Sequence, residues 1–371
     1  MYACYFGSLA LFSGLISIYL MDQGYTPSQI SLVTSCSYIA SMVIQPLVGS
    51  LNDHFPGRSH RITGILLIIA GLMGILFLFA KSLWSTALLY SLTLGLYQST
   101  NPVIERCATG ARFPYRSIRI WGTLGYAAGS QLGGLVYGFL SPGSMFPCFC
   151  IGAFLCASGL SGIRDLAPSA SADTARENSS RLISRPFLVY LLIACLFYGP
   201  TNLNSTYLPA MFQAQGIPVE LVSTIIFTLT LSELPLIFFS HIFMDRFSCT
   251  QLLSAVFLLL ILQFGVYSLI PSPAVWIAAA ILTKATTTME FIMINLKTVA
   301  ALAGAARQLT ALSLVATCKS FASIVFQALG GYILEQSTYQ RLYLLLAAAA
   351  TGLFLCLTGS LPDGRQQKLF S

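Results

Sequence analysis

Long apolar stretches run through almost all of this 371-residue chain, and its charged residues are too few to cover a soluble protein of that size. Apolar residues make up 56% of the chain and charged residues 8%, whereas a soluble domain carries about 25% charged residues. A water-soluble core of this length needs a charged shell that these residues cannot supply. We therefore predict an integral membrane protein whose immediate partner is the lipid bilayer.

The apolar stretches have the length of transmembrane helices. A hydrocarbon core about 30 Å thick takes roughly 20 helical residues to cross. By that measure the sequence predicts an all-α membrane protein with twelve spans. The predicted spans are 1–21, 28–52, 62–80, 84–104, 117–140, 144–163, 186–209, 218–243, 250–270, 274–300, 308–333 and 340–360.

The basic residues are distributed unevenly between the two sides of these spans. If both termini are cytoplasmic, most Lys and Arg lie in cytoplasmic segments, and the outer loops hold only Lys81 and Arg341. An excess of positive charge on the inner side is the usual pattern of membrane proteins. The net charge of +7 therefore indicates orientation in a cell membrane rather than binding to nucleic acid.

The spans divide into two similar sets of six. The polar stretch 164–185 predicts a cytoplasmic linker between an N-terminal bundle, 1–163, and a C-terminal bundle, 186–371, which ends in a short cytoplasmic tail. Two motifs recur about half a chain apart. Residues 49–53 are echoed by 241–246, and residues 131–134 are echoed by 327–331. Two pseudo-symmetric bundles of this kind are typical of transporters, whose solute site lies near the bilayer midplane.

Four ionisable residues lie near the middle of predicted spans: Glu233, Lys284, Glu290 and Lys319. A bare charge at mid-membrane costs at least roughly 3 kcal/mol on insertion scales, so such residues usually face a protein interior or a water-filled path. Four of them in one half of the chain indicate a route for a polar solute or an ion.

A second polar group joins the fourth and fifth spans. Asn101 and Glu105 are one helical turn apart, Arg119 opens the fifth span, and Tyr126 follows two turns later. A guanidinium offers a planar fork of donors and an aromatic ring can stack on a sugar or a base, so we predict that Asn101, Arg119 and Tyr126 bind a polar solute. The alternative is that Glu105 lies in a cytoplasmic turn and Arg119 is an ordinary basic flank.

The tenth span carries a carboxylate that can take up a proton. Thr283, Thr287 and Glu290 share one helical face, whereas Lys284 points about 240° away from Glu290. Lys284 therefore needs a partner on another helix or a backbone carbonyl. We predict proton coupling by Glu290 with Lys284 and Lys319. The alternative is a static charge pair between Glu290 and Lys319.

Prolines accompany polar residues in the seventh and eighth spans. Pro235 follows Glu233 by two residues, and Gly199-Pro200 precedes Asn202. Proline frees a backbone carbonyl and kinks a helix, often at a cavity wall. We therefore predict that both spans are broken and that Glu233 and Asn202 line the solute path.

Acidic and basic residues flank the inner ends of two corresponding spans: Asp53 with Arg58, and Asp245 with Arg246. We predict that these four residues form a cytoplasmic gate, with a solvated turn as the alternative.

Glycines of the fifth span recur at helical spacing. Gly122, Gly125, Gly129 and Gly133 fall on one face, and small residues let helix backbones approach closely in lipid. We expect a packing groove there.

These residues resemble the major facilitator superfamily, and within it the lactose permease-like branch of oligosaccharide and nucleoside proton symporters. The resemblance covers nearly the whole chain. It rests on the loop from Gly49 to Arg58, on Gln45-Pro46, on 319–335, and most specifically on YRSIRIWGTLGY at 115–126.

The resemblance implies a function. Arg119 falls at the position of a sugar-binding arginine, Tyr126 at that of an aromatic on which sugar stacks, and Glu290 at that of a carboxylate that carries the proton. Two positions depart from the pattern, since Asn101 stands in place of a carboxylate and Thr287 in place of a histidine. The expected function is secondary active transport of a small polar organic solute, a sugar or nucleoside, by alternating access with proton symport.

Other functional classes find less support in the sequence. The three histidines and ten scattered cysteines show no catalytic or metal-ligand spacing. We therefore expect no enzyme activity, no cofactor and no metal site, and a protein that works as a monomer. An uncoupled facilitator and a transport-dead sensor on the same fold remain alternatives.

Overall fold

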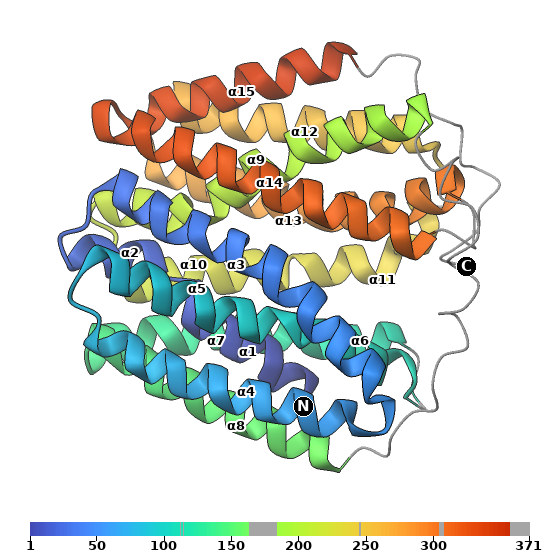
Figure 1. Cartoon of the computed structure of the whole chain (residues 1–371). Helices are drawn as coiled ribbons and strands as arrows, with labels where there is room; N and C mark the ends of the chain where they lie inside the picture. Colours follow the sequence, from blue (N-terminus) through green and yellow to red (C-terminus); the bar gives the residue numbers. More distant parts are fainter. Residues whose placement is uncertain (112, 114, 163–183, 245, 304–307, 357–371) are drawn as a thin grey trace. The chain divides into compact units, whose positions relative to one another are not determined.

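The computed structural model describes residues 1–111, 113, 115–162, 184–244, 246–303 and 308–356, and within them every long element is a helix (Figure 1). The predicted linker 164–185 and Asp245 lie outside this description, apart from the last two linker residues. The helices are α1 (Tyr2–Ser13), α2 (Ile16–Asp22), α3 (Pro27–His54), α4 (Ser59–Leu76), α5 (Leu83–Ser99), α6 (Asn101–Thr109), α7 (Tyr115–Phe139), α8 (Met145–Ser161), α9 (Arg185–Ala214), α10 (Val219–Leu231), α11 (Glu233–Met244), α12 (Cys249–Leu269), α13 (Pro273–Ala303), α14 (Gln308–Gln336) and α15 (Tyr339–Cys356).

Each of the twelve predicted spans coincides with one helix or with two consecutive ones. In the part of the chain that the structure describes, nine helical segments are long and apolar enough to cross a bilayer. The other three predicted ranges are occupied by α5 with the start of α6, by α7 and by α15.

The fourth span, predicted as one helix, is broken into two. Helix α5 ends at Ser99 and α6 begins at Asn101, because the Thr100 hydroxyl bonds the Tyr97 carbonyl at 2.6 Å and Pro102 occupies the first turn of α6. Proline is tolerated there because first-turn amides have no partner within the helix. Tyr97 is therefore separated from Asn101 and is fully buried against the stacked ring of Tyr5.

The eighth span is broken as predicted, and the seventh is not. Ser232 separates α10 from α11, so that Glu233 becomes the first residue of α11 and Pro235 lies in its first turn. Helix α9 instead runs without interruption through Pro200. The prediction of a broken seventh span was wrong, since α9 continues through Pro200 although this proline cannot donate to the Leu196 carbonyl.

The described residues group into two compact units. The first contains the described residues up to 162 together with Asn204–Leu231 and Gln327–Glu335, and the second contains the described parts of 184–203, 232–326 and 336–356. Helices α9 and α14 each contribute residues to both units. The division at 163–186 into two six-helix bundles stays a prediction.

Helix α1 packs on α7 in the first unit through the predicted glycine groove. A side chain at Gly125 would collide with the backbone of Ala3, and one at Gly129 with that of Gly7. The packing role predicted for these glycines is confirmed, because only a hydrogen lets the two backbones approach so closely. Buried aromatic rings fill the neighbouring core, in which Phe12 contacts Phe77, Tyr90, Phe146 and Phe149.

In the second unit, α12 packs against α13 and α15, and α11 packs against α13. The N-terminal part of α9 meets α13 through the rings of Phe197 and Phe291, whose centroids are 3.7 Å apart in a nearly parallel stack. The buried amide Gln263 donates a hydrogen bond to Tyr267 at 3.0 Å along α12. These contacts fix the helices that carry the ionisable residues of this unit.

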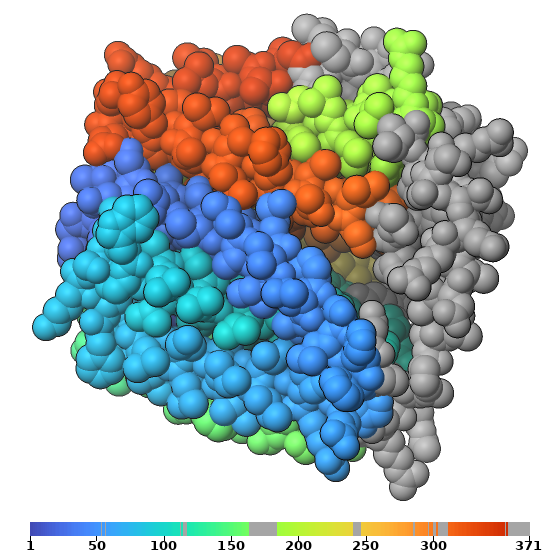
Figure 2. All heavy atoms as spheres, in the orientation of Figure 1, coloured from blue at the N-terminus to red at the C-terminus, as the bar shows by residue number. Residues whose placement is uncertain are grey.

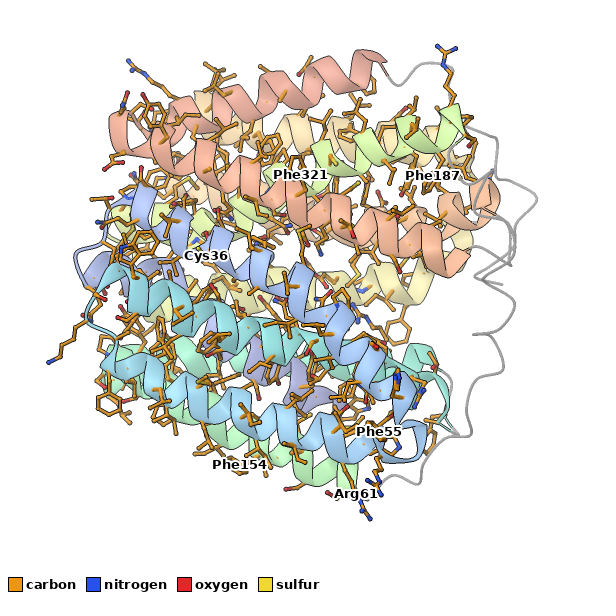
Figure 3. All side chains as sticks on the ribbon, viewed as in Figure 1. Cys36, Phe55, Arg61, Phe154, Phe187 and Phe321 are labelled. Carbon is orange, nitrogen blue, oxygen red and sulfur yellow. The ribbon has the colours of Figure 1, made fainter. Side chains whose placement is uncertain are left out.

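Large apolar side chains cover the outward faces of both units. Trp84 and Phe139 are among the most exposed, and Phe154 and Phe321 also project from their helices (Figure 3). In the first unit α3 and α5 pack along most of their lengths and α5 also packs on α4, and these helices form a continuous surface in Figure 2. Exposed apolar area on this scale is suited to lipid and not to water.

Candidate functional site

An ion pair links α6 and α7 in the first unit. The nearest atoms of Arg119 and Glu105, Nη1 and Oε1, are 3.4 Å apart, and the two side chains are 25% and 27% exposed. The Tyr2 hydroxyl donates to the same Glu105 oxygen at 2.8 Å and accepts from Arg119 at 3.1 Å. The guanidinium also lies 5.3 Å from the centre of the Phe6 ring. This cluster is held in place but remains accessible to a small molecule.

Local helix breaks position the cluster. The break at Thr100 makes Asn101 the first residue of α6 and places Glu105 one turn later on the same face. Arg119 lies in the second turn of α7, and Tyr2 and Phe6 are one turn apart on α1. The Asn101 side-chain oxygen is buried and has no hydrogen-bond partner among the described residues. A buried amide oxygen of this kind is suited to a ligand hydroxyl or amine.

Tyr126 lies on α7, about two helical turns beyond Arg119. Tyr90 of α5 lies in the neighbourhood of Tyr126 of α7 and Tyr38 of α3. Tyr90 itself is 3% exposed and stacks on Phe12, so it belongs to the core, whereas Tyr126 is partly exposed. The aromatic ring predicted to contact the solute therefore lies two turns from Arg119 and is partly exposed, next to the buried core around Tyr90.

Asn202 lies in a hydrogen-bonded group of the second unit. Its side-chain nitrogen donates to the Ser323 hydroxyl at 2.6 Å, and Ser323 donates to the backbone carbonyl of Lys319 at 2.8 Å. The Lys319 ammonium lies 4.8 Å from the centre of the Tyr198 ring. Asn202 and Lys319, predicted from separate spans, are thus brought together by the packing of α9 on α14.

Lys284 has the partner on another helix that its orientation requires. Glu233, at the start of α11, interacts electrostatically with Lys284 of α13. On α13 the Thr287 hydroxyl donates to the Lys284 carbonyl at 3.0 Å. Glu290 faces elsewhere, and one of its carboxylate oxygens is buried without a hydrogen-bond partner in the described part of the chain.

The structure leaves the predicted cytoplasmic gate a prediction. Asp53 lies in the last turn of α3, with a side chain outside the described set. Arg58 and Arg246 are exposed, and Asp245 lies outside the described residues.

Sequence reasoning left several residues of these clusters unnamed, among them Tyr2, Tyr198 and Ser323. Each is polar or aromatic in an apolar span, but no spacing rule links it to its partner. Glu105 was named only as a contact of uncertain role. Its helical register with Asn101 was the one feature of the sequence that pointed to it.

Comparison with known proteins identifies the family. The MFS_1 like family, within the major facilitator superfamily, matches residues 1–361. The chain belongs to this family. That match confirms the resemblance to the major facilitator superfamily and the multi-pass membrane architecture.

Two relatives are sugar permeases. The maltose permease of Geobacillus stearothermophilus is 25% identical over 357 residues, which cover 92% of this chain and 87% of the permease. The melibiose permease of Enterobacter cloacae is 26% identical over 155 residues, which cover 38% of this chain and 36% of that protein.

Solved structures confirm the twelve-helix fold. The nucleoside transporter NupG superposes with a TM-score of 0.76 at 16% identity and covers 96% of both chains. The D-xylose-proton symporter superposes with a TM-score of 0.73 at 14% identity and covers 99% of this chain and 97% of its own. At these identities the likeness establishes the fold, with its two pseudo-symmetric sets of six helices.

Proposed function

We propose that this protein is a secondary active transporter that moves a sugar or a nucleoside across the cell membrane by alternating access, together with a proton. The observation that carries the proposal is the partly exposed Arg119–Glu105 pair, hydrogen-bonded by Tyr2, in a chain of this family. The relatives named as maltose and melibiose permeases support a sugar, and the fold shared with NupG supports a nucleoside.

The solute is bound by hydrogen bonds from the first unit. Arg119 donates and Glu105 accepts, so a hydroxyl that both donates and accepts can bridge them. The Asn101 oxygen, which has no described partner, accepts from a second hydroxyl or amine. Tyr126 supplies an aromatic face for the ring of a sugar or base. In the second unit, Asn202 and Glu233 are the residues proposed to line the solute path.

Proton coupling is assigned to the second unit. Glu290 is the acid that exchanges the proton, because one of its oxygens has no fixed donor among the described residues. Lys284 and Lys319 are positioning residues. Lys284 is balanced by Glu233, and Lys319 is held over the Tyr198 ring.

The remaining parts of the proposal follow from the family and the charge distribution. The chain resides in the cell membrane with both termini cytoplasmic, functions as a monomer and catalyses no reaction. The exposed Arg58 and Arg246 act with Asp53 and Asp245 at the cytoplasmic side.

An uptake screen in proteoliposomes tests the proposal. Labelled disaccharides, monosaccharides and nucleosides are offered with and without an imposed inward proton gradient. We expect one of these classes to accumulate above its equilibrium level only when the gradient is present. Equilibration without accumulation would replace symport by facilitated diffusion, and the absence of uptake of every solute would refute the transport assignment.

A further inference from the structure

Helices α9 and α14 approach each other closely in the second unit. A side chain at Gly199 of α9 would collide with the Phe326 ring of α14, so only a hydrogen at this position permits the approach. Three residues along α9, the Asn202 side chain donates to the Ser323 hydroxyl at 2.6 Å. Short side chains that face each other across this helix pair are therefore within bonding distance.

Two cysteines face each other nearer the beginning of the same helices. The Cys195 thiol of α9 donates to the backbone carbonyl of Cys318 of α14 at 3.5 Å, and it is also within hydrogen-bonding reach of the Cys318 thiol. Both residues are free thiols, and both are half-buried. The two sulfur atoms are thus adjacent, not bonded to each other, and partly open to a small molecule.

This arrangement suits a disulfide. A disulfide holds the Cα atoms of its two cysteines about 4.4–6.8 Å apart, so the backbones must already be close before the bond can form. Because the Cys195 sulfur reaches the main chain of Cys318, rotation of the two side chains is the main movement that bond formation requires.

The depth of the pair places it on the side of the membrane where thiols are normally reduced. Helix α9 begins at Arg185 and α14 at Gln308, about ten residues before each cysteine, which is about 15 Å of helix. In the predicted topology these helix ends are cytoplasmic. The cytosol keeps thiols reduced, and disulfides that form there are usually transient or redox-sensing.

Other cysteines of the chain lack this combination of contact and access. Cys156 of α8 and Cys249 of α12 are completely buried, so they are small apolar packing groups that an oxidant cannot reach. The pair on α9 and α14 differs because both of its sulfurs are partly accessible and each has the other as a neighbour.

We propose that Cys195 and Cys318 form a redox-active dithiol, a modification site whose co-reactant is a hydroperoxide. The thiolate of one cysteine attacks an oxygen of hydrogen peroxide, which breaks the O–O bond, forms a sulfenic acid and releases hydroxide. The hydroxide takes up the proton that the thiol lost and becomes water. The second thiol then attacks the oxidised sulfur, forms the S–S bond and releases a second water. Two thiols and one peroxide thus give one disulfide and two waters.

The bond would join α9 and α14 next to residues that the proposed function uses. Lys319 follows Cys318 directly, and its ammonium lies 4.8 Å from the centre of the Tyr198 ring, one turn beyond Cys195. The dithiol itself does not depend on the proposed function, because its reaction involves only the two thiols and the peroxide.

Peptide mapping of the purified protein tests the site. Folded protein in detergent is treated with hydrogen peroxide at about pH 8.5, where a free cysteine is half ionised. Catalase stops the reaction, remaining thiols are alkylated, and the protein is digested without a reducing agent. We expect a linked pair of peptides that contain Cys195 and Cys318 and that dithiothreitol separates. The link should form at least about tenfold faster than in protein unfolded before oxidation, because contact raises the effective concentration of one thiol at the other.

Single variants identify the partners. Cys195→Ser and Cys318→Ser should each abolish the link and leave a sulfenic acid on the remaining thiol, which a cyclic 1,3-diketone captures. The matched control is Cys36→Ser, because Cys36 of α3 is also a free, half-buried thiol. We expect the Cys36 variant to form the link at the rate of the unaltered chain.

The mapping decides the question whether or not a solute is transported. Two thiols that are still fully alkylated after peroxide treatment would overturn the dithiol, and so would a link that forms no faster in folded than in unfolded protein. If a serine variant fails to give a monodisperse protein, the comparison of folded with unfolded unaltered chain decides alone. Failure of the uptake screen together with rapid linkage would refute transport and leave the dithiol standing.

Discussion

Replacing Arg119 tests the solute site at the residue that the structure ties most firmly to its neighbours. Arg119→Ala removes the guanidinium that contacts Glu105 at 3.4 Å, Tyr2 at 3.1 Å and the Phe6 ring. A hydrogen bond to a charged group contributes about 1.5–3 kcal/mol when it replaces no other partner. Because both side chains are about one quarter exposed, part of that contribution is screened by water. We therefore expect Arg119→Ala to lose about 2 kcal/mol of binding free energy for the solute, which corresponds to about a 30-fold rise in Kd.

The assay is equilibrium binding of the transported solute to detergent-purified protein by titration calorimetry. Arg341→Ala is the matched control, because Arg341 is an exposed arginine at the start of α15 and its removal changes the net charge equally. Glu105→Ala and the double variant complete a thermodynamic cycle. We expect the double variant to bind little more weakly than either single one, because the two side chains grip the same part of the solute.

Unchanged affinity in Arg119→Ala, with Arg341→Ala also unchanged, would remove Arg119 from the solute site. Strictly additive losses of binding free energy in the cycle would refute the idea that Arg119 and Glu105 contact the same part of the solute. In that case the ion pair would be a brace between α6 and α7, and the binding site would have to be sought among Tyr126 and the residues of the second unit.

Three further predictions follow from the same structure. Glu290→Gln should abolish accumulation of solute against its gradient yet preserve counterflow exchange in proteoliposomes; accumulation in this variant would move the coupling site elsewhere. Gly125→Ala should destabilise the protein by roughly 1–3 kcal/mol, because its methyl group meets the Ala3 backbone. Thermal unfolding in detergent measures this loss, and Gly265→Ala, which meets no neighbour within 4 Å inside α12, should unfold at or slightly above the parent temperature. Glu233→Gln should lower stability by leaving Lys284 without its acidic partner, and adding Lys284→Gln should restore part of the loss; a double variant no more stable than Glu233→Gln would argue against the pairing.

The positions of the helices could be predicted from the sequence, because apolar length alone decides which segments can cross a bilayer. The glycine groove of α7 was predictable for a similar reason, since four small residues on one face leave close packing as the simplest use of that face. The identity of the opposite helix was not predictable. Nothing in the local sequence specifies that Ala3 and Gly7 of α1 approach Gly125 and Gly129.

Polar residues in the spans were easy to find, but their partners were not. Lys284 was expected to need a partner on another helix because its direction on α13 excludes Glu290, and packing of α11 supplies Glu233. Tyr2 could not be assigned to Glu105 and Arg119, because a tyrosine at the start of an apolar helix has many possible uses. Which polar groups meet is decided by helix rotation and crossing, which one sequence does not reveal.

The prolines show that a proline alone does not decide whether a span breaks. The chain breaks before Pro102 and Pro235 but continues through Pro46, Pro200 and Pro209. At both breaks a hydroxyl residue precedes the proline by two or three positions and bonds a backbone carbonyl, as Thr100 does to Tyr97 and Ser232 to Ile281.

The two breaks also have a common consequence for function. Each begins a new helix with a polar residue, Asn101 on α6 and Glu233 on α11, and presents first-turn amides that have no partner within the helix. Inside a bilayer such backbone is tolerated only where it is buried in protein or borders a water-filled cavity. The breaks occur in two spans that carry residues proposed to contact the solute, Asn101 in the fourth and Glu233 in the eighth.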